Sequence, residues 1–391
     1  MKFLHIILLS DLWEKYHRKE FTKEFVKQLP DGDAALIVQL PVSLLVYLFT
    51  NFKRLVNLVR GKYKIRELDK NAILFTPVIL FHYLFWEKFS LLFYIDFFLM
   101  NYQLKKIIKK RNKNRKLVLW VYFPYLKSFA AKFRKDILIY DQYDIYQMDV
   151  NGKINNKIKS LNSELIRKSD IVFNTSKYLY DISIELNRNS FYITNGNNFN
   201  LLYSSSKHKA TLNLPVPGAK IIGYLGGIRD WIDFDLLEFI ISQKNEVNFI
   251  FIGKIYPSAF KEMEKIRTHK NVIWMDYVQP EILPAYLSLF DAGLIPFKST
   301  EFFKSVFPNK FYEYLASGIP AITTNLLELK KYDGIIGYSN NENEFLENCD
   351  RAINGYFNKY KNEYEKLSKE NSWSVKAEEI LNIIINTIYK K

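Results

Sequence analysis

The C-terminal half of the chain repeats one pattern, in which a short and continuously apolar run is followed by a helix-sized stretch. The runs lie at residues 219–226, 247–253, 271–278, 292–297, 319–324 and 334–338. Strands that are apolar throughout are buried on both faces, as in parallel sheets covered by helices. We therefore expect a doubly wound parallel α/β domain over residues 219–372. Apolar residues at helical spacing predict a closing amphipathic helix over residues 373–391.

The N-terminal half shows the same alternation less regularly. A chain of 391 residues exceeds the size of one hydrophobic core, so two domains are expected. Residues 201–218 are rich in serine and basic residues, contain two prolines and lack periodicity, which indicates a linker after an N-terminal domain of residues 1–200. A helix is expected at residues 154–168, and strands at 2–9, 34–40, 72–75, 117–122, 137–140, 169–176 and 190–196.

The net charge of +15 is concentrated in two segments of the N-terminal half. Neither segment contains an acid; the first has six basic residues and the second eight, namely Lys53, Arg54, Arg60, Lys62, Lys64 and Arg66, then Lys105, Lys106, Lys109, Lys110, Arg111, Lys113, Arg115 and Lys116. Apolar and aromatic residues adjoin both segments, and no nucleic-acid motif accompanies them. This favours peripheral binding to an anionic membrane surface over binding to nucleic acid. The alternative is that both are solvated helix faces.

Other classes are excluded by simple features. The single cysteine, Cys349, rules out an internal disulfide and a cysteine-based zinc site, and favours a reducing cytoplasm. The most apolar stretch, residues 72–100, contains a proline and several charged residues, so we expect no transmembrane helix.

Two places after strands carry residues suited to anion binding. Gly226 and Gly227 let the backbone approach a ligand, and Arg229 can donate two hydrogen bonds to a phosphate. The glycines could equally form only a tight turn. Further on, Lys310 and Glu313 lie in the first turns of a predicted helix, where Lys310 can bind a phosphate and Glu313 can accept ribose hydroxyls, although helix capping would also select an acid there.

These residues carry a resemblance. The strand followed by Gly226–Gly227 and Arg229, the run FIFIG ending at residue 253, and the segments at 271–297 and 308–324 match in order the nucleotide-binding domain of GT-B glycosyltransferases resembling family 4. The N-terminal half is similar to the teichuronic-acid, capsule and exopolysaccharide transferases of bacteria. It shares with them a tryptophan–arginine pair (Trp13 and Arg18), a Thr-Pro pair (Thr76 and Pro77) and a Tyr-Asp-x-x-Asp element (Tyr140, Asp141 and Asp144). The runs at residues 119–124 and 169–176 are shared as well.

The resemblance implies a GT-B fold of two Rossmann-like domains facing a cleft, with a C-terminal helix closing back on the N-terminal domain. It implies that the C-terminal domain binds a nucleotide sugar without a metal or other cofactor. The implied donor-site residues are Gly226, Gly227, Arg229, Asp276, Tyr277, Val278, Val306, Phe307, Pro308, Lys310 and Glu313. Asp276, Tyr277 and Val278 would flank the base, which we expect to be uracil, and residues 306–308 would pass near the diphosphate or sugar.

The catalytic residues follow from the same resemblance. Arg229 and Lys310 would neutralise the departing diphosphate. Asp141 and Asp144 are the candidates for a catalytic base, although either could instead cap the next helix. His17, Arg18 and Asp144 would contact the acceptor, with a mere surface charge as the alternative for Arg18.

The function implied is that of a hexosyltransferase on the cytoplasmic face of the membrane. It would move a sugar from a nucleotide-diphospho-sugar to a lipid-linked glycan during cell-surface polysaccharide biosynthesis. Two alternatives stay open. A GT-B sugar-nucleotide epimerase would leave the basic segments unexplained, and a non-catalytic membrane-surface protein would not need Arg229, Lys310 and Glu313 together.

Overall fold

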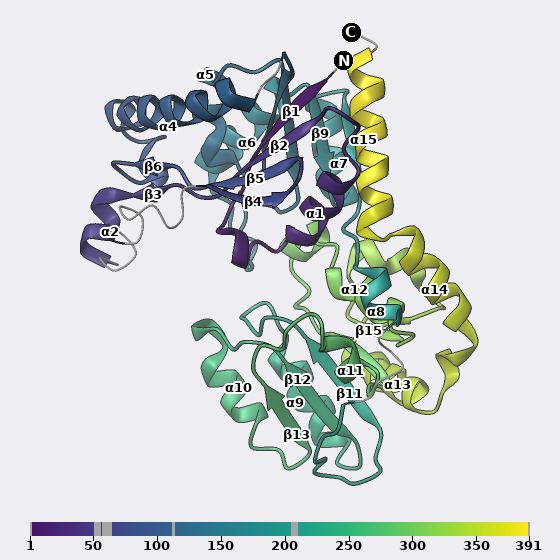
Figure 1. Ribbon diagram of the computed structural model, residues 1–391. Helices are drawn as coiled ribbons and strands as arrows, with labels where there is room; N and C mark the ends of the chain where they lie inside the picture. The colour runs from purple at the N-terminus through teal and green to yellow at the C-terminus, as the bar shows by residue number, and fades with distance from the viewer. Residues whose placement is uncertain (1, 51–55, 57–64, 112–113, 205–209, 390–391) are drawn as a thin grey trace. The chain divides into compact units, whose positions relative to one another are not determined.

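A computed structural model describes residues 2–50, 56, 65–111, 114–204 and 210–389. The chain divides into two compact units (Figure 1). Unit 1 comprises residues 1–148, 154–193 and 377–391, and unit 2 comprises residues 149–153 and 194–376. The change of unit thus falls at residue 194, ahead of the predicted linker at 201–218, and residues 210–220 carry no helix or strand.

Unit 1 is built on an eight-stranded sheet in the order β10-β9-β8-β7-β1-β2-β5-β4. All neighbours pair in parallel except the edge strand β4, which runs antiparallel to β5. The strands are β1 (Phe3–Leu8), β2 (Ala34–Val38), β4 (Ile65–Asp69), β5 (Ala72–Phe75), β7 (Lys116–Val121), β8 (Ile137–Gln142), β9 (Ile171–Asn174) and β10 (Ser190–Tyr192). The expected strands of this half are confirmed with shifted ends, whereas β4 was not expected.

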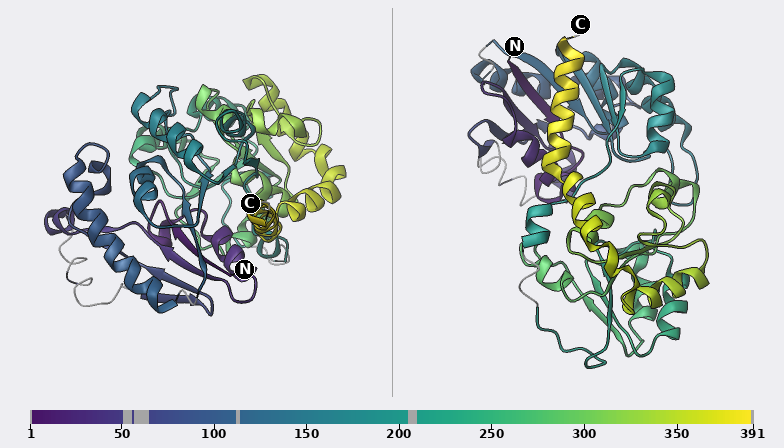
Figure 2. Two further views of the ribbon diagram at one scale, coloured as in Figure 1. Left: turned by 90° about the horizontal axis from the view of Figure 1, so that it is seen from above. Right: turned by 90° about the vertical axis from the view of Figure 1, so that its right-hand side faces the viewer.

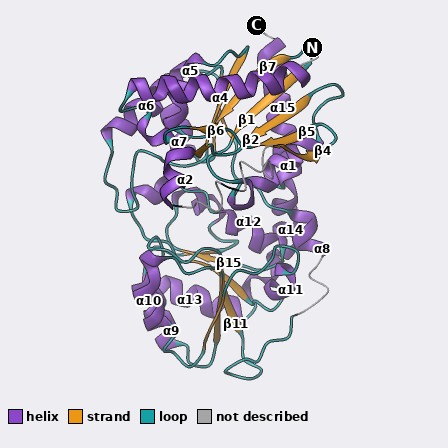
Figure 3. Cartoon of the chain, turned by 60° about the vertical axis from the view of Figure 1, so that its left-hand side comes forward, coloured by secondary structure: helices purple, strands orange, loops and turns teal. Residues whose placement is uncertain are grey.

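Helices cover both faces of this sheet (Figure 3). One face packs against α4 (Ser90–Arg111), α5 (Lys127–Lys132) and α6 (Asn156–Lys168). On the other face, α1 (Lys19–Lys27) packs an aromatic ring, Phe25, against His5 and Trp120 of the sheet. Unit 1 also contains α2 (Leu44–Thr50), α7 (Lys177–Leu186), the two-stranded pair β3 (Val42–Ser43) and β6 (Val78–Ile79), and the 3-10 helices η1 (Trp13–Lys15), η2 (Tyr83–Phe85) and η3 (Pro124–Leu126).

Unit 2 contains a six-stranded parallel sheet in the order β13-β12-β11-β14-β15-β16. Each of the six predicted runs forms one of its strands: β11 (Ile221–Leu225), β12 (Asn248–Ile252), β13 (Val272–Met275), β14 (Ala292–Ile295), β15 (Ala321–Thr323) and β16 (Gly337–Tyr338). Unit 2 also contains the helices α8 (Phe199–Ser204), which precedes β11, α9 (Phe234–Gln243), α10 (Phe260–Ile266), α11 (Leu283–Leu287), α12 (Asn309–Ala316), α13 (Glu342–Ile353) and α14 (Lys361–Glu370). Its 3-10 helices are η5 (Pro257–Ala259), η6 (Glu301–Ser305), η7 (Leu327–Tyr332) and η8 (Tyr356–Tyr360). β11 and β12 are buried at every position, as expected for strands covered on both faces.

The final helix, α15 (Trp373–Tyr389), is the predicted closing helix. Its residues from Ala377 onward group with unit 1 (Figure 2). Ala377, Ile380, Leu381 and Ile384 are buried at the spacing of one helix face. Within the parts of the chain that the structure describes, no helix has both the length and the hydropathy to span a bilayer.

The strand order sets where each unit can bind a ligand. In unit 1 the chain runs outward through β1, β2 and β5 and returns to add β7 on the other side of β1. In unit 2 it runs outward through β11, β12 and β13 and returns to add β14 beside β11. Loops leave in opposite directions at such a reversal, which opens a crevice at the carboxyl ends of the two strands. The candidate residues are therefore sought beyond β1 and β7 in unit 1, and beyond β11 and β14 in unit 2.

Candidate active site

The predicted glycine loop follows β11, at the reversal point of unit 2. Gly226 has a φ of +121° and its amide donates to the carbonyl of Ile252 at 2.8 Å. Gly253, at the end of β12, has a φ of +146°, and a Cβ there would lie 2.1 Å from the carbonyl oxygen of Gly226. Gly253 needs to be glycine because a side chain there would strike the backbone of Gly226, and Gly226 favours glycine because its φ lies in a region that other residues rarely adopt. The loop is therefore more than a tight turn, since β12 also determines its path.

Lys310 is brought directly to this loop from α12. A Cβ on Gly226 would lie 2.7 Å from the Lys310 ammonium nitrogen, so the missing side chain is what admits the lysine. The ammonium also lies 5.0 Å from the ring centre of Tyr224 and 5.4 Å from that of Phe297. Among the described residues it forms no ion pair. A cation held by ring faces beside exposed backbone is suited to receiving an anion.

Arg229 lies three residues after Gly226. Its guanidinium carbon lies 3.6 Å above the ring centre of Tyr256 and 5.0 Å from that of Trp231. Stacking on two aromatic rings holds the planar group while leaving its in-plane donors available. Within the described part of the chain it forms no ion pair, and its buried Nε has no hydrogen-bond partner.

Two further buried polar atoms, on residues close in the chain to Arg229 and Lys310, have no hydrogen-bond partner among the described residues. They are the indole Nε1 of Trp231 and the side-chain oxygen Oδ1 of Asn309, the first residue of α12. Buried polar groups in folded proteins are nearly always hydrogen-bonded, so unsatisfied ones call for a ligand or water. Neither residue was identified from the sequence, where a lone tryptophan or asparagine carries no such signal.

Glu313 lies one turn after Lys310 on α12. Burial raises the pKa of its carboxyl group, and the charge of Lys310 opposes that rise. Its carboxylate makes no hydrogen bond to a described residue, and no side chain caps the start of α12. The capping explanation for Glu313 is therefore wrong, and the carboxylate stays available to accept hydrogen bonds.

The other predicted donor-site residues differ in how far their side chains are available. Phe307 and Pro308 are buried, and the Phe307 ring packs at 5.1 Å on Tyr312, so only the backbone of this segment can approach a ligand. The Phe307 carbonyl already accepts a hydrogen bond from Asn195 at 3.0 Å. Val306 is partly buried. Gly227 packs close to Tyr256, since a Cβ at that position would lie 3.2 Å from the tyrosine ring.

The loop after β13 holds the residues predicted to flank a base. The ring of Tyr277 is 70% exposed, and its amide donates to the Asp276 carboxylate at 2.7 Å. Val278 is partly buried. No described interaction links this loop to Arg229 or Lys310, so its role stays a prediction.

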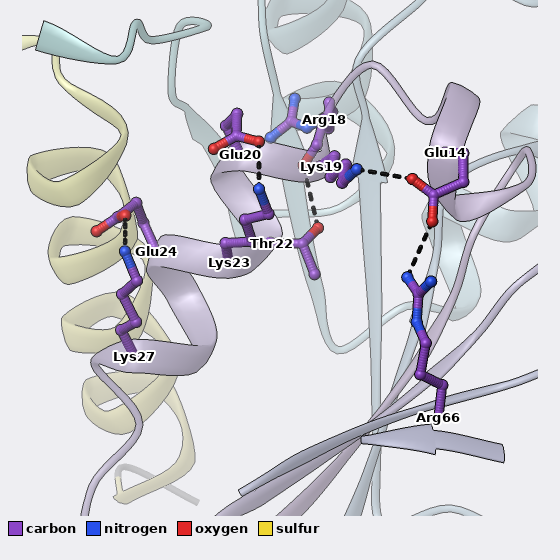
Figure 4. Close-up of polar contacts among 9 residues, drawn as sticks. All are labelled: Glu14, Arg18, Lys19, Glu20, Thr22, Lys23, Glu24, Lys27 and Arg66. Carbon is purple, nitrogen blue, oxygen red and sulfur yellow. Dashed lines mark hydrogen bonds and ion pairs between the residues drawn. The ribbon is translucent and has the colours of Figure 1, made fainter. Parts of the chain in front are cut away.

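In unit 1, Arg18 and Asp141 form a buried ion pair at the sheet's reversal point. Arg18 precedes α1 (Figure 4) and Asp141 lies in β8, next to β7. Their nearest nitrogen and oxygen atoms are 3.0 Å apart, and the two side chains are 3% and 1% exposed. Burial raises the pKa of Asp141, and the Arg18 charge opposes that rise. The alternative that Arg18 is a surface charge is therefore wrong.

A group of tyrosines surrounds this pair. Tyr16 and Tyr122 meet edge to face at 5.8 Å, and Tyr143 lies at the same distance from Tyr122. The Tyr143 hydroxyl bonds with the hydroxyl of Ser10, after β1, at 2.6 Å. The rings exclude water from the pair, and the attraction between the two opposite charges offsets the cost of their burial. They were missed from the sequence, although Tyr143 stands between the two aspartates.

Asp144 is partly buried and has no ionic partner among the described residues. Its carboxylate accepts a hydrogen bond from the amide of Ile145 at 2.8 Å. Burial raises its pKa from the usual 3.8 to about 6. The next helix, α6, is capped by Asn155, so neither aspartate serves as its cap. A carboxyl group with such a pKa can take a proton near neutral pH.

His17 lies beside these residues; part of the residue reaches solvent, while its ring packs against the rings of Tyr16 and Tyr143. The ring meets Tyr143 edge to face at 4.6 Å. Desolvation and then the charge of Arg18 lower the pKa of His17 to about 4, so the ring is neutral at pH 7. Near the start of α1 the remaining charges are exposed pairs, with Glu14 accepting from both Lys19 and Arg66 (Figure 4). Such exposed pairs contribute little to stability.

Among the described residues, no group of three or more His, Cys, Asp or Glu side chains is arranged to hold a metal ion. Of the first basic segment, Arg66 is described and the other five basic residues lie outside the described residues, as does Lys113 of the second.

The chain is similar to known proteins in sequence and in fold. A family model described as glycosyl transferases group 1 matches residues 219–354. The Bacillus subtilis (strain 168) protein TuaH, named for a glycosyltransferase role in teichuronic acid biosynthesis, is 24% identical over 279 residues, which are 67% of this chain and 70% of that protein.

Three solved structures share the fold across nearly whole chains. Sucrose-phosphate synthase of Thermosynechococcus elongatus has a TM-score of 0.72 at 12% identity, covering 100% of both chains. Anabaena HepE in complex with UDP has a TM-score of 0.67 at 12% identity, covering 99% of this chain and 100% of that one. An E. coli trehalose-6-phosphate structure with bound UDP-2-fluoro glucose has a TM-score of 0.67 at 10% identity, covering 98% of both.

Proposed function

We propose that the chain is a GT-B glycosyltransferase of the family 4-like type, as its matches and its fold support, and that it transfers a sugar from a UDP-sugar to a lipid-linked glycan. The observation that carries the proposal is the convergence of Gly226, Lys310 and Arg229 at the reversal point of the unit 2 sheet. A glycine backbone and two cations without an ionic partner in the described chain form a site for a diphosphate.

The proposed donor roles are divided among the residues around this site. Lys310 and Arg229 bind the diphosphate, and Glu313 accepts hydrogen bonds from the ribose hydroxyls. Tyr277, exposed beyond β13, stacks on the uracil with Asp276 and Val278 beside it. UDP is supported by two structural neighbours whose solved forms contain UDP or UDP-2-fluoro glucose.

The reaction forms one bond and breaks another. The acceptor hydroxyl oxygen attacks the anomeric carbon, and the bond from that carbon to the diphosphate oxygen breaks with its electron pair passing to UDP. The negative charge that grows on UDP is stabilised by Lys310 and Arg229, whose charge takes the place of a metal ion. Asp144 takes the proton of the attacking hydroxyl, which suits a pKa of about 6. Arg18 and Asp141 hold the acceptor side of unit 1 in shape, with His17 exposed next to it.

We place the acceptor among the lipid-linked glycans of bacterial surface polysaccharides, such as a capsule or exopolysaccharide. The support is the similarity to TuaH, a protein named for teichuronic acid biosynthesis. Such an acceptor lies at the cytoplasmic face of the membrane, so we also propose peripheral binding there.

Thermal unfolding with a panel of nucleoside diphosphates tests the donor site. UDP at about 100 times its dissociation constant should stabilise the protein by about 2.7 kcal/mol, which shifts the midpoint by several degrees. Glu313→Gln should reduce the shift, and Lys310→Ala should abolish it. Glu347→Gln, at an exposed position of α13, serves as the matched control and should leave it unchanged.

The reaction itself is tested by UDP release from a panel of UDP-sugars in the presence of a membrane lipid extract. Lys310→Ala should lower the rate about 100- to 1,000-fold, as removal of one transition-state donor does elsewhere. Absence of a UDP shift in folded wild-type protein, or an equal shift in the Lys310→Ala variant, would refute the donor assignment.

A further inference from the structure

Helix α4 presents an apolar face to solvent as well as to the core. Eleven of the 19 large apolar side chains that are exposed in the described residues fall between residues 45 and 102. Four of them stand on the outer face of α4, namely Leu91, Tyr94, Phe98 and Tyr102, with exposed fractions of 70%, 51%, 69% and 64%. We call these four the α4 ridge. Their spacings of three or four residues put them on one stripe of the helix.

Buried contacts determine which way α4 faces. The inner side carries Phe93, Met100 and Leu104 into the unit 1 core. Asp96 on that side is fully buried, and its carboxylate accepts hydrogen bonds from the amides of Leu80 and Phe81 and from the Trp86 indole at 2.8, 3.0 and 2.9 Å. Rotating α4 to hide the ridge would break all three bonds. The exposed ridge is therefore a consequence of the fold.

The same stripe changes from apolar to cationic along the helix. After Tyr102, the outward positions are the exposed Lys105 and Lys109. At 1.5 Å per residue the stripe from Leu91 to Lys109 extends about 27 Å. The only acid of α4 is the buried Asp96. A favourable helix dipole explains a lysine in the last turn, but it does not explain exposed aromatic rings.

A basic groove adjoins the cationic end of the stripe. It has a volume of about 320 Å³ and lies between the end of α4, the start of β7 and the segment after α5. Lys105, Lys109 and Arg134 line it, and none of the three forms an ion pair with a described residue. Arg115 lines it too but donates to the carbonyls of Gly32 and Arg111. The carboxylate of Asp136 in the same groove accepts a hydrogen bond from the Leu117 amide at 2.6 Å.

We propose that the α4 ridge and this groove together dock unit 1 on an anionic phospholipid leaflet. The rings of the ridge enter the interface between headgroups and acyl chains, and Lys105, Lys109 and Arg134 bind headgroup phosphates in the groove. A leaflet is the occupant that needs aromatic bulk and positive charge side by side on one helix. α2, which carries the exposed Phe49, lies on the same side of unit 1 as α4 (Figures 1 and 2) and extends the docking surface. The inference deepens the peripheral binding in the proposed function and rests on it for its biological role.

Flotation of the full chain with vesicles tests the proposal. Phosphatidylcholine vesicles that contain phosphatidylglycerol should bind the wild type, and pure phosphatidylcholine vesicles should bind it weakly. Lys105→Gln/Lys109→Gln should lower the partition coefficient about 30-fold in low salt. Lys361→Gln/Lys366→Gln removes the same charge from exposed positions of α14 and should have little effect.

The aromatic part of the surface has its own pair of variants. Phe98→Ser should lower binding at least about tenfold, because a ring of this size loses a large apolar area in the interface. Phe260→Ser, at a 53% exposed ring on α10, is the control and should bind as the wild type does. The UDP-induced thermal shift, read on the same samples, should be unchanged in all four variants, so failure of docking is separated from failure of the donor site.

Three results would overturn the proposal. The wild type could fail to bind anionic vesicles while keeping its UDP shift. The test and control variants could lose binding equally, which would indicate diffuse charge attraction. Light scattering could show a dimer that Phe98→Ser separates, which would make the ridge a contact between two copies of the chain.

Discussion

Replacement of Asp144 by asparagine tests the electrostatics of unit 1 most directly. The carboxyl group has a pKa of about 6 in the folded protein because burial disfavours its charge, against 3.8 for an ordinary aspartate. Below pH 3.8 both the folded and the unfolded chain hold the proton, so the group does not affect stability. Above pH 6 both have lost it, and the folded state then carries a cost of about 3 kcal/mol. The wild type therefore loses this stability as pH rises from about 4 to 6.

Asparagine has the shape of the protonated acid and never becomes charged. Asp144→Asn should match the wild type at pH 4 and exceed its stability by up to about 3 kcal/mol at pH 7.5. For a unit of roughly 200 residues this is a rise of up to about 6–12 °C in the unfolding midpoint. Calorimetry at the two pH values measures it, with Asp31→Asn, at an exposed carboxyl group of the same unit, as the control.

The same variant tests the catalytic role. If Asp144 is the base, the wild-type kcat/KM should fall as pH drops below about 6, and Asp144→Asn should lower it about 100- to 10,000-fold with no such pH limb. A variant that gains stability at pH 7.5 but keeps its activity would show that the carboxyl group is buried without being the base. A stability difference that does not change between pH 4 and pH 7.5 would refute the burial argument itself.

Three further perturbations address other parts of the molecule. Gly253→Ala should destabilise unit 2 by several kcal/mol, because its Cβ would lie 2.1 Å from the Gly226 carbonyl oxygen and its φ is +146°. The control Gly218→Ala, with a φ of +75° and no atom within 4 Å of the added Cβ, should lower the unfolding midpoint clearly less. Equal decreases of the midpoint in the two variants would contradict the clash. Arg18→Met should destabilise the protein by about 3–5 kcal/mol, because it leaves the buried Asp141 without its partner. Adding Asp141→Leu should restore most of the free energy of unfolding, measured in urea. A double variant as unstable as the single one would argue against the buried pair. Dialysis against EDTA should leave UDP-sugar turnover unchanged, and a loss that Mg²⁺ restores would contradict the metal-free mechanism.

The fold of unit 2 could be predicted from the sequence because local signals agree there. Each strand is a short apolar run bounded by glycine or a polar turn, and a parallel sheet needs just such runs. The positions of Lys310 and Arg229 followed, since ligands bind at the carboxyl ends of parallel strands. The contact between Lys310 and Gly226 could not be predicted, because it depends on how α12 packs beside β11.

Unit 1 was less predictable for physical reasons. α4 has apolar residues on its inner and its outer faces, so it lacks the one-sided periodicity that identifies a helix. Asp96 in its middle looked like an interruption of an apolar run, yet it is fully buried and accepts three hydrogen bonds. Burial of Arg18 depends on Asp141, more than a hundred residues away in the chain. Phe307 was predicted to pass near the diphosphate or sugar, but the sequence did not show that its apolar ring packs in the core and leaves only its backbone for that role.

The two aspartates of unit 1 illustrate how neighbouring acids acquire separate roles. Asp141 lies in β8 and forms an ion pair with Arg18, 3.0 Å away. Asp144 lies two residues after the end of β8 and forms no ion pair with a described residue. Burial raises the pKa of both, but only Asp141 has a paired charge that opposes the rise. Because their environments differ in this way, Asp141 is suited to ion pairing and Asp144 to proton transfer. Removal of Arg18 should then raise the pKa of Asp141 as well, and the activity of Arg18→Met should titrate with two groups instead of one.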